Sequence, residues 1–341
     1  MRGDELWAAV DRLVDRAPTV DDLRSHRLEL FAARRWRQLG RDVPAEVAQR
    51  ERAAGVIPLT VPALLSHIRD VYEGPAILHK GPEVAAAYPD PALRVFGDID
   101  LLVPDAELAQ RALLAGGFEL TGDPELYIDI HHLRPLRWHE LPLVVEIHSR
   151  PKWIDSSSPP SVAEMLEVAV PSRVAEGFLA LPPAEHALVL AAHSWAHEPL
   201  RRIRDLVDIA AVLGDADAAA ISAVARRWGV SRLWRSTFEA LDFLFGQGRE
   251  PLSLRTWARS LPQARERTVL EHHLERWLSD FWVSPPTRAA AGVPRTLADE
   301  LRPAPDESWR AKLARTGRAF RNAARRRSEH REELVRTTRR D

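Results

Sequence analysis

The spacing of apolar residues changes twice along this chain of 341 residues, and the two changes divide it into three parts. Before about residue 73, and again after about residue 156, large apolar side chains recur three or four positions apart, as in amphipathic helices. Between residues 76 and 154, short apolar runs alternate with polar residues, as in strands. The pattern predicts an α+β fold, in which helical segments flank a small mixed sheet.

Proline-rich and glycine-rich stretches indicate where these parts begin and end. The chain is punctuated at Gly74-Pro75, at residues 156–160 and at Pro303-Ala304-Pro305, and Val61-Pro62 predicts the start of a helix. We expect an N-terminal helical segment (1–73), a sheet-containing domain (74–155), a helical domain (156–302) and a basic tail (303–341).

The composition excludes several classes of protein. Cysteine is absent, so the chain has no disulfides, no thiolate metal sites and no cysteine nucleophile. No apolar run approaches the roughly 18 residues that a membrane-spanning helix needs, and the start of the chain does not look like a signal peptide. We therefore expect a cytoplasmic protein without a membrane span.

The net charge of -1 conceals a basic C-terminal region. Residues 310–341 contain 12 Lys and Arg against 4 Asp and Glu, a balance of +8, which leaves -9 for the rest of the chain. Such a segment is either a solvated tail or a contact for RNA, another polyanion or an acidic partner. Its large apolar residues (Leu313, Phe320 and Leu334) are too sparse for a membrane-inserted helix.

The stretch Phe96-Gly97-Asp98-Ile99-Asp100-Leu101-Leu102-Val103 carries the strongest chemical signal. Side chains alternate along a strand, so Asp98 and Asp100 project from one face while Ile99, Leu101 and Val103 point into the core. Two adjacent carboxylates repel each other unless a cation lies between them. Asp-Ile-Asp by itself is usually a solvated strand edge. The motifs before and after it are therefore needed to predict a metal site here.

A second predicted strand repeats the arrangement. Val145 and Ile147 point inward, whereas Glu146 and His148 share the opposite face. Carboxylate oxygens are the ligands that magnesium prefers. Three acids on neighbouring strands therefore predict a site for two magnesium ions and for phosphoryl or nucleotidyl transfer.

Several motifs in order resemble a known family. They are Leu78-His79-Lys80-Gly81, Tyr88-Pro89, Arg94, Asp98 to Val103 and Val145 to His148. This run resembles the uncharacterised bacterial nucleotidyltransferase family of the polymerase-beta superfamily. Residues 191–197 and 204–210 are similar to the helical half of that family, and the resemblance covers roughly residues 60–215.

The resemblance implies roles for individual residues. Asp98 and Asp100 would bind both magnesium ions, and Glu146 would complete the catalytic one. Gly81 would form the nucleotide-binding turn, although Lys80-Gly81-Pro82 stands where the superfamily has Gly-Ser. Lys80 would replace the serine as a phosphate contact. Arg94 is either a second phosphate contact or an ordinary surface arginine.

The expected function is magnesium-dependent transfer of a nucleoside monophosphate from a nucleoside triphosphate, with release of pyrophosphate. ATP is the donor by analogy, and the acceptor is a peptide, a protein, a small molecule or RNA. The missing serine and the basic tail favour an alternative, a nucleotide-binding or regulatory protein with weak catalysis.

The histidines suggest a third possibility, a metal hydrolase. His193 and His197 have the spacing of a helical zinc site, and Asp205 and Asp208 follow them. The His-Glu-x-x-His pattern is missing, which makes this reading the weakest of the three. We expect a further group of histidines in loops at the rim of the site, namely His131, His132 and His139.

Overall fold

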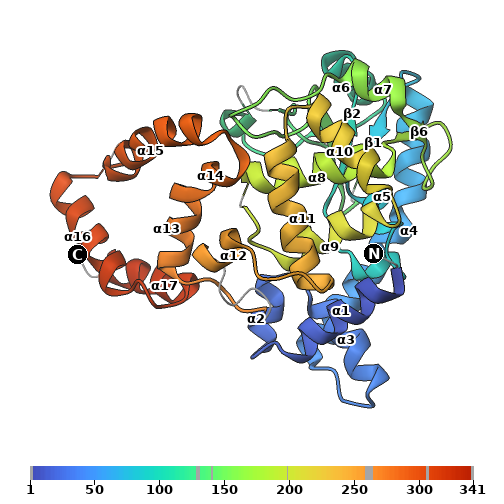
Figure 1. Cartoon of the computed structure of the whole chain (residues 1–341). Coiled ribbons are helices and arrows are strands. Elements are labelled where there is room, and N and C mark those ends of the chain that lie inside the picture. Colours follow the sequence, from blue (N-terminus) through green and yellow to red (C-terminus); the bar gives the residue numbers. More distant parts are fainter. Residues whose placement is uncertain are drawn as a thin grey trace.

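The computed structural model describes residues 3–127, 131–139, 141–197, 199–257, 264–304 and 307–338. A mixed seven-stranded sheet lies among helices from both ends of the chain, in the order β3-β4-β5-β2-β1-β7-β6 (Figure 1). The strands are β1 (Ile77–Leu78), β2 (Asp98–Leu102), β3 (Glu119–Leu120), β4 (Leu136–Arg137), β5 (Val144–His148), β6 (Val170–Pro171) and β7 (Leu179–Ala180). The predicted α+β class is confirmed.

Helices precede, connect and follow the strands. Before the sheet come α1 (Gly3–Asp15), α2 (Val20–Ser25), α3 (Glu29–Gln38) and α4 (Ala45–Val71). Between strands lie α5 (Pro82–Ala85), η1 (Pro91–Leu93), α6 (Ala106–Ala115), η2 (Pro124–Tyr127) and α7 (Val162–Val168). After the sheet come α8 (Pro183–His197), α9 (Ile203–Leu213), α10 (Ala218–Arg227), α11 (Ser231–Phe245) and α12 (Leu252–Trp257). The last helices are α13 (Val269–Leu278), α14 (Asp280–Val283), α15 (Pro286–Leu301), α16 (Trp309–Arg321) and α17 (Arg327–Thr338).

One face of the sheet packs against α4 and α6. Ile99 and Leu101 of β2 and Val145 and Ile147 of β5 are all buried in this core, together with Leu64, Leu65 and Ile68 of α4. The alternation predicted for both strands is confirmed. Because side chains alternate, Asp98, Asp100 and Glu146 project from the opposite face.

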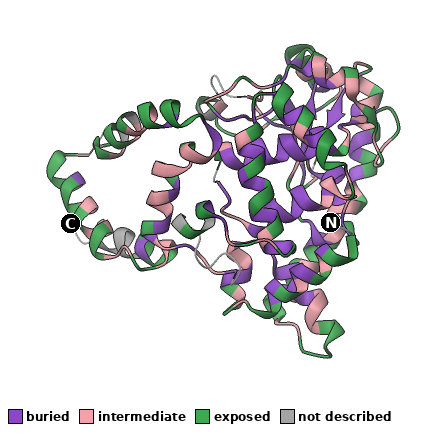
Figure 2. Ribbon diagram, viewed as in Figure 1, coloured by how far each residue is buried: buried purple, intermediate pink, exposed green. Residues whose placement is uncertain are grey.

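The opposite face belongs to a second, larger core. Ile77 of β1 and Leu102 of β2 lie in it, with apolar residues of α1, α3, α8, α9 and α11. Figure 2 shows buried residues concentrated in the sheet and in these central helices, whereas α15, α16 and α17 are mostly exposed. The polar face of β2 is therefore covered by helices, which places its carboxylates inside the protein.

Helix α4 differs from the prediction of a helix beginning near Val61. It is continuous from Ala45 and runs through Pro58 and Pro62. Proline removes a backbone N–H and disfavours a helix interior. Buried residues on both sides of the prolines, Val47 and Leu64 among them, pack against the body and hold one helix.

The C-terminal helices extend away from the body and return to it (Figure 1). The N–H of Val269 donates to the carbonyl of Arg325 at 3.0 Å, and the Arg326 guanidinium lies 3.2 Å from the buried Asp22 carboxylate. The basic segment is thus attached to α2 near the start of the chain. No helix in the described part of the chain is long and apolar enough to cross a membrane.

Candidate active site

The predicted carboxylates lie on two neighbouring strands. Strands β2 and β5 are parallel, and Asp100 is the register partner of Glu146. Asp98 is two positions earlier on the same face of β2, opposite Val144. The fold therefore brings Asp98, Asp100 and Glu146 to one face at the centre of the sheet.

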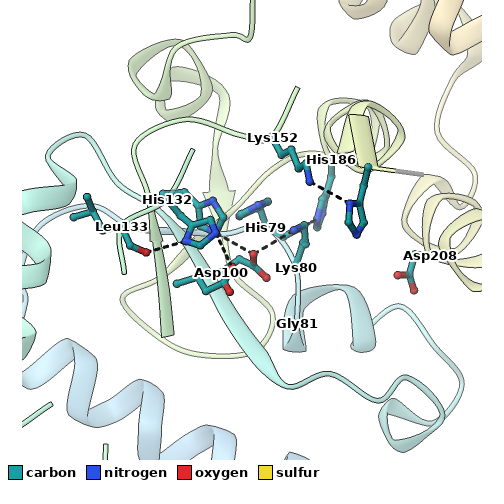
Figure 3. A network of polar contacts seen from close by, with 12 residues as sticks. His79, Lys80, Gly81, Asp100, His132, Leu133, Lys152, His186 and Asp208 are labelled. Atoms are coloured by element: carbon teal, nitrogen blue, oxygen red, sulfur yellow. Dashed lines mark hydrogen bonds and ion pairs between the residues drawn. The ribbon is translucent and has the colours of Figure 1, made fainter. Parts of the chain in front are cut away.

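Asp100 is fully buried and surrounded by nitrogen atoms (Figure 3). Its Oδ1 accepts a hydrogen bond from Lys80 Nζ at 3.2 Å and lies 3.0 Å from His148 Nε2. Burial disfavours the charged carboxylate, but the Lys80 ammonium and His148 outweigh burial and hold the pKa of Asp100 well below its usual range. Its Oδ2 is buried without a hydrogen-bond partner among the described residues.

Asp98 is in a different electrostatic environment, although it is on the same strand. Burial and the neighbouring Asp100 charge raise the pKa of Asp98 to about 6, and Lys80 only partly offsets this rise. The contrast arises because Lys80 contacts Asp100 directly. The charged form of Asp98 is therefore poorly compensated by the protein itself.

His148 lies close to an acidic side chain of each strand, Asp100 of β2 and Glu146 of β5. Its Nε2 lies 3.6 Å from Glu146 Oε2 as well as 3.0 Å from Asp100 Oδ1. Burial disfavours the imidazolium, but these two carboxylates raise the pKa of His148. His132 Nε2 lies 3.8 Å from Glu146 Oε2 on the outer side.

The turn at Gly81 packs directly on the backbone of β2. Gly81 has a φ of 55°, and a Cβ at this position would lie 2.7 Å from the Asp98 carbonyl oxygen. Only glycine adopts this conformation without strain and also permits so close an approach. The Lys80-Gly81 turn is thereby held beside the carboxylates, while its role in nucleotide binding stays a prediction.

Arg94 is neither an exposed arginine nor an unpaired phosphate contact. Its Nε and Nη2 each donate to the Asp208 carboxylate at 2.9 Å, and its Nη1 donates to the Gly81 carbonyl at 3.1 Å. Tyr88 also donates its hydroxyl proton to Asp208. Arg94 is buried and connects the Gly81 turn to α9, while its contact with a nucleotide phosphate stays a prediction.

A cavity of about 310 Å³ lies beside Asp98 and Lys80. Three more arginines line it: Arg27 after α2, Arg202 before α9 and Arg204 in α9. Sequence analysis missed all three, because they come from segments far from the carboxylates along the chain. The only sequence signal was Arg204, which belongs to the 204–210 motif of the resemblance.

A larger cavity of about 800 Å³ lies on the other side of the site. Tyr127, His131, His132, Lys152 and Trp153 are among its lining residues. Lys152 of this larger cavity has its Nζ 3.3 Å from Nδ1 of His197, which lines the smaller cavity. Of the predicted rim histidines, His131 and His132 line the larger cavity.

The remaining histidines do not form the zinc site considered from sequence. The ring centroids of His193 and His197 are 6.2 Å apart, and no third metal-ligating side chain converges with them among the described residues. Among the described residues, the metal-ligating side chains that converge are those of His79, Asp100 and His148, whose ligand atoms all lie within 4.8 Å of one another. His79 was quoted in the sequence motif without a role, and it packs edge-on against His148. His139 packs beside Trp138 instead of lining the site.

The donors suit a hard divalent cation. Asp98, Asp100 and Glu146 provide carboxylate oxygens, which magnesium prefers. The partnerless Oδ2 of Asp100 and the raised pKa of Asp98 both indicate negative charge that the described residues leave uncompensated. The residues present therefore fit a magnesium site, with Lys80 as the competing cation.

Comparison with known proteins agrees with this geometry. A family model described as "uncharacterised nucleotidyltransferase" matches residues 20–246, which is 227 of the 341 residues. No curated protein and no solved structure matches the chain. The matched segment contains both acid-bearing strands, the Gly81 turn and helices α8 and α9. The chain therefore belongs to the uncharacterised nucleotidyltransferase family.

Proposed function

We propose that the protein transfers a nucleoside monophosphate from a nucleoside triphosphate to an acceptor and releases pyrophosphate. The observation that carries this proposal is the pairing of Asp100 with Glu146 across β2 and β5, with Asp98 next to a cation-lined cavity. Membership of a nucleotidyltransferase family supports the reaction class. AMP transfer from ATP is the default, by analogy alone.

The cofactor of this proposal is a pair of magnesium ions held by Asp98, Asp100 and Glu146. When bound, magnesium neutralises the triphosphate and lowers the pKa of the attacking acceptor group. Gly81 lets the turn pack closely on the backbone of β2, and Arg94 holds that turn through its carbonyl. Lys80, Arg27 and Arg202 line the smaller cavity, where they would bind phosphate oxygens.

The acceptor would enter through the larger cavity. Tyr127 and Trp153 provide aromatic surface there, and Lys152 provides positive charge. A peptide, a protein, a small molecule and RNA all remain acceptor classes for this cavity. Binding of a polyanion or an acidic partner by the basic tail also remains a proposal.

One observation favours a second candidate, a nucleotide-binding protein with weak or no transfer. Lys80 Nζ lies 3.2 Å from Asp100 Oδ1, so a protein cation already neutralises the carboxylate that would bind both magnesium ions. The serine expected after Gly81 is also replaced by Pro82. This candidate binds nucleoside triphosphates but does not turn them over.

The decisive experiment uses each nucleoside triphosphate labelled at the α-phosphorus, with magnesium and separate peptide, protein, small-molecule and RNA fractions of cell extract. Transfer predicts acceptor-bound label and free pyrophosphate with the wild type but not with Asp98→Asn. Asp70→Asn, on the exposed side of α4, is the matched control and should retain activity. Nucleotide binding without any labelled acceptor would favour the second candidate.

A further inference from the structure

Another cavity, of about 380 Å³, lies where distant parts of the chain meet; it shares Arg27 and Arg202 with the donor cavity, but Asp98 is not among its lining residues. Seven arginines line it: two from α2 and the turn after it, two from the α8–α9 connection, two from the segment before α13, and Arg327 at the start of α17. Such a concentration of guanidinium groups around one cavity is typical of sites for phosphate groups.

The carboxylates at this cavity do not balance its arginines. Asp21 and Glu275 each bind an arginine of the lining, and Glu266 accepts hydrogen bonds from the N–H and hydroxyl of Ser328 at 2.9 and 2.6 Å. Two carboxylates outside the lining also bind its arginines, those of Glu46 and Glu271. Within the lining itself, seven arginines thus outnumber three carboxylates, those of Asp21, Glu266 and Glu275.

The titration of the lining residues reflects this excess. Burial, followed by neighbouring arginines, lowers the pKa of both Arg27 and Arg201 to about 10. Burial and nearby cations, Arg327 first among them, lower the pKa of His272 to about 4. An anion in the cavity would relieve the repulsion among these groups.

The walls of the cavity are joined to one another by His26. Its Nε2–H donates to the Arg265 carbonyl at 2.7 Å, and its Nδ1 accepts from the Ile203 N–H at 3.2 Å. His26 is buried, so both ring nitrogens are used inside the protein. The three connections that carry six of the arginines are therefore held together before any ligand binds.

Backbone strain is concentrated at the same place. Arg27, Leu200 and Ala264 have φ values of 56°, 50° and 51°, and they are three of the four non-glycine residues with positive φ in the described chain. Arg27 lines the cavity, and the other two directly precede lining arginines. Such conformations cost energy and persist where the surrounding structure requires them, often at binding sites.

We propose that this arginine-lined cavity is a second phosphate site, which adjoins the donor cavity and shares Arg27 and Arg202 with it, for an anion that carries several phosphate groups. A free oligophosphate and an RNA strand present the same chemistry, and the experiment below distinguishes them. Five of the lining residues come from 265–275, and Arg327 lies in α17, so much of the site is outside the family match at residues 20–246. Six of the thirteen lining residues thus lie beyond the matched segment.

The test measures binding of tripolyphosphate and of a short single-stranded RNA by calorimetry, without magnesium. The variant Arg201→Gln/Arg327→Gln changes two arginines that do not line the donor cavity. The control Arg111→Gln/Arg137→Gln removes the same charge from exposed positions on α6 and β4. We expect the first variant to weaken binding at least about tenfold, and the control and Lys80→Met to retain it.

Binding of tripolyphosphate in this pattern supports a free oligophosphate ligand, and binding of RNA alone supports a nucleic acid ligand. Absence of binding by the wild type, or an equal loss in the control, overturns the proposal. If the double variant does not fold, Arg327→Lys replaces it, since lysine keeps the charge but loses the planar fork. Unchanged affinity in Arg327→Lys and in Arg201→Gln then overturns the proposal as well.

Discussion

Lys80 Nζ lies 3.2 Å from Asp100 Oδ1, so the lysine beside the Gly81 turn neutralises a buried carboxylate of β2. Lys80 retains 16 % of its side-chain exposure, whereas Asp100 retains none. Bound magnesium would compete with Lys80 for Asp100 and replace it there. A phosphate would then bind the released Lys80 ammonium. Apo and loaded proteins would then differ in this one contact.

Lys80→Met should destabilise the magnesium-free protein by roughly 1–3 kcal/mol, because the buried Asp100 loses its hydrogen-bonded cation. Magnesium should restore more stability to this variant than to the wild type, since it meets no competing ammonium. Urea unfolding with EDTA and with magnesium measures both effects. Lys152→Met is the control, and an equal magnesium response in both variants would contradict the competition.

Asp98→Asn should abolish transfer without lowering the urea midpoint, because it removes a charge that Asp100 repels. Asp100→Asn should also be inactive but less stable, since Lys80 then loses its carboxylate partner. The difference between the two variants follows from the contacts of Asp100 with Lys80 and His148. Equal destabilisation by both substitutions, or turnover by either one, would refute this assignment.

The Arg94–Asp208 pair is predicted to support the Gly81 turn. Arg94→Met should cost about 3–5 kcal/mol, because it leaves Asp208 buried without its bidentate partner. The double variant Arg94→Met/Asp208→Leu should recover part of that loss. A double-mutant cycle by urea unfolding measures the coupling, and simple additivity of the two losses would argue against it.

Gly81→Ala should lower both stability and nucleotide affinity. Its Cβ would lie 2.7 Å from the Asp98 carbonyl, and the φ of 55° is unfavourable for alanine. We expect a loss of at least about 1 kcal/mol in the free energy of unfolding. Gly40→Ala, also at positive φ but with no atom within 4 Å of the added Cβ, separates the contact from the backbone strain.

Stability should fall between pH 6.5 and about 4 because of His26. Burial lowers its pKa to about 4, and its Nδ1 must stay unprotonated to accept the Ile203 N–H. The unfolded chain binds this proton near pH 6.5, so the contribution is present above that pH and is lost as the pH falls toward 4. The free energy of unfolding should decrease from pH 7 to pH 5. This decrease should be roughly 1–2 kcal/mol larger in the wild type than in His26→Gln. An identical pH dependence would exclude His26 as the cause.

The face shared by Asp98, Asp100, Glu146 and His148 could be predicted from sequence because strand alternation is a local property. The family resemblance likewise predicted the Gly81 turn. The sequence could not predict that Arg27 and Arg202 line the cavity, or that Arg94 is buried. These features depend on how α2, α9 and the Gly81 turn pack together. Pro58 and Pro62 misled the helix assignment because tertiary contacts on both sides of them outweigh their local preference.

The contacts between α2 and the C-terminal region have a consequence for biosynthesis. His26 and Arg265 are 239 positions apart, and Asp22 and Arg326 are 304 positions apart. Loop closure over such separations is slow and cannot occur until the later partner has left the ribosome. Strands β2 and β5 are complete by residue 148, so the centre of the sheet can form during translation, whereas the arginine-lined cavity closes only after nearly all of the chain has been synthesised.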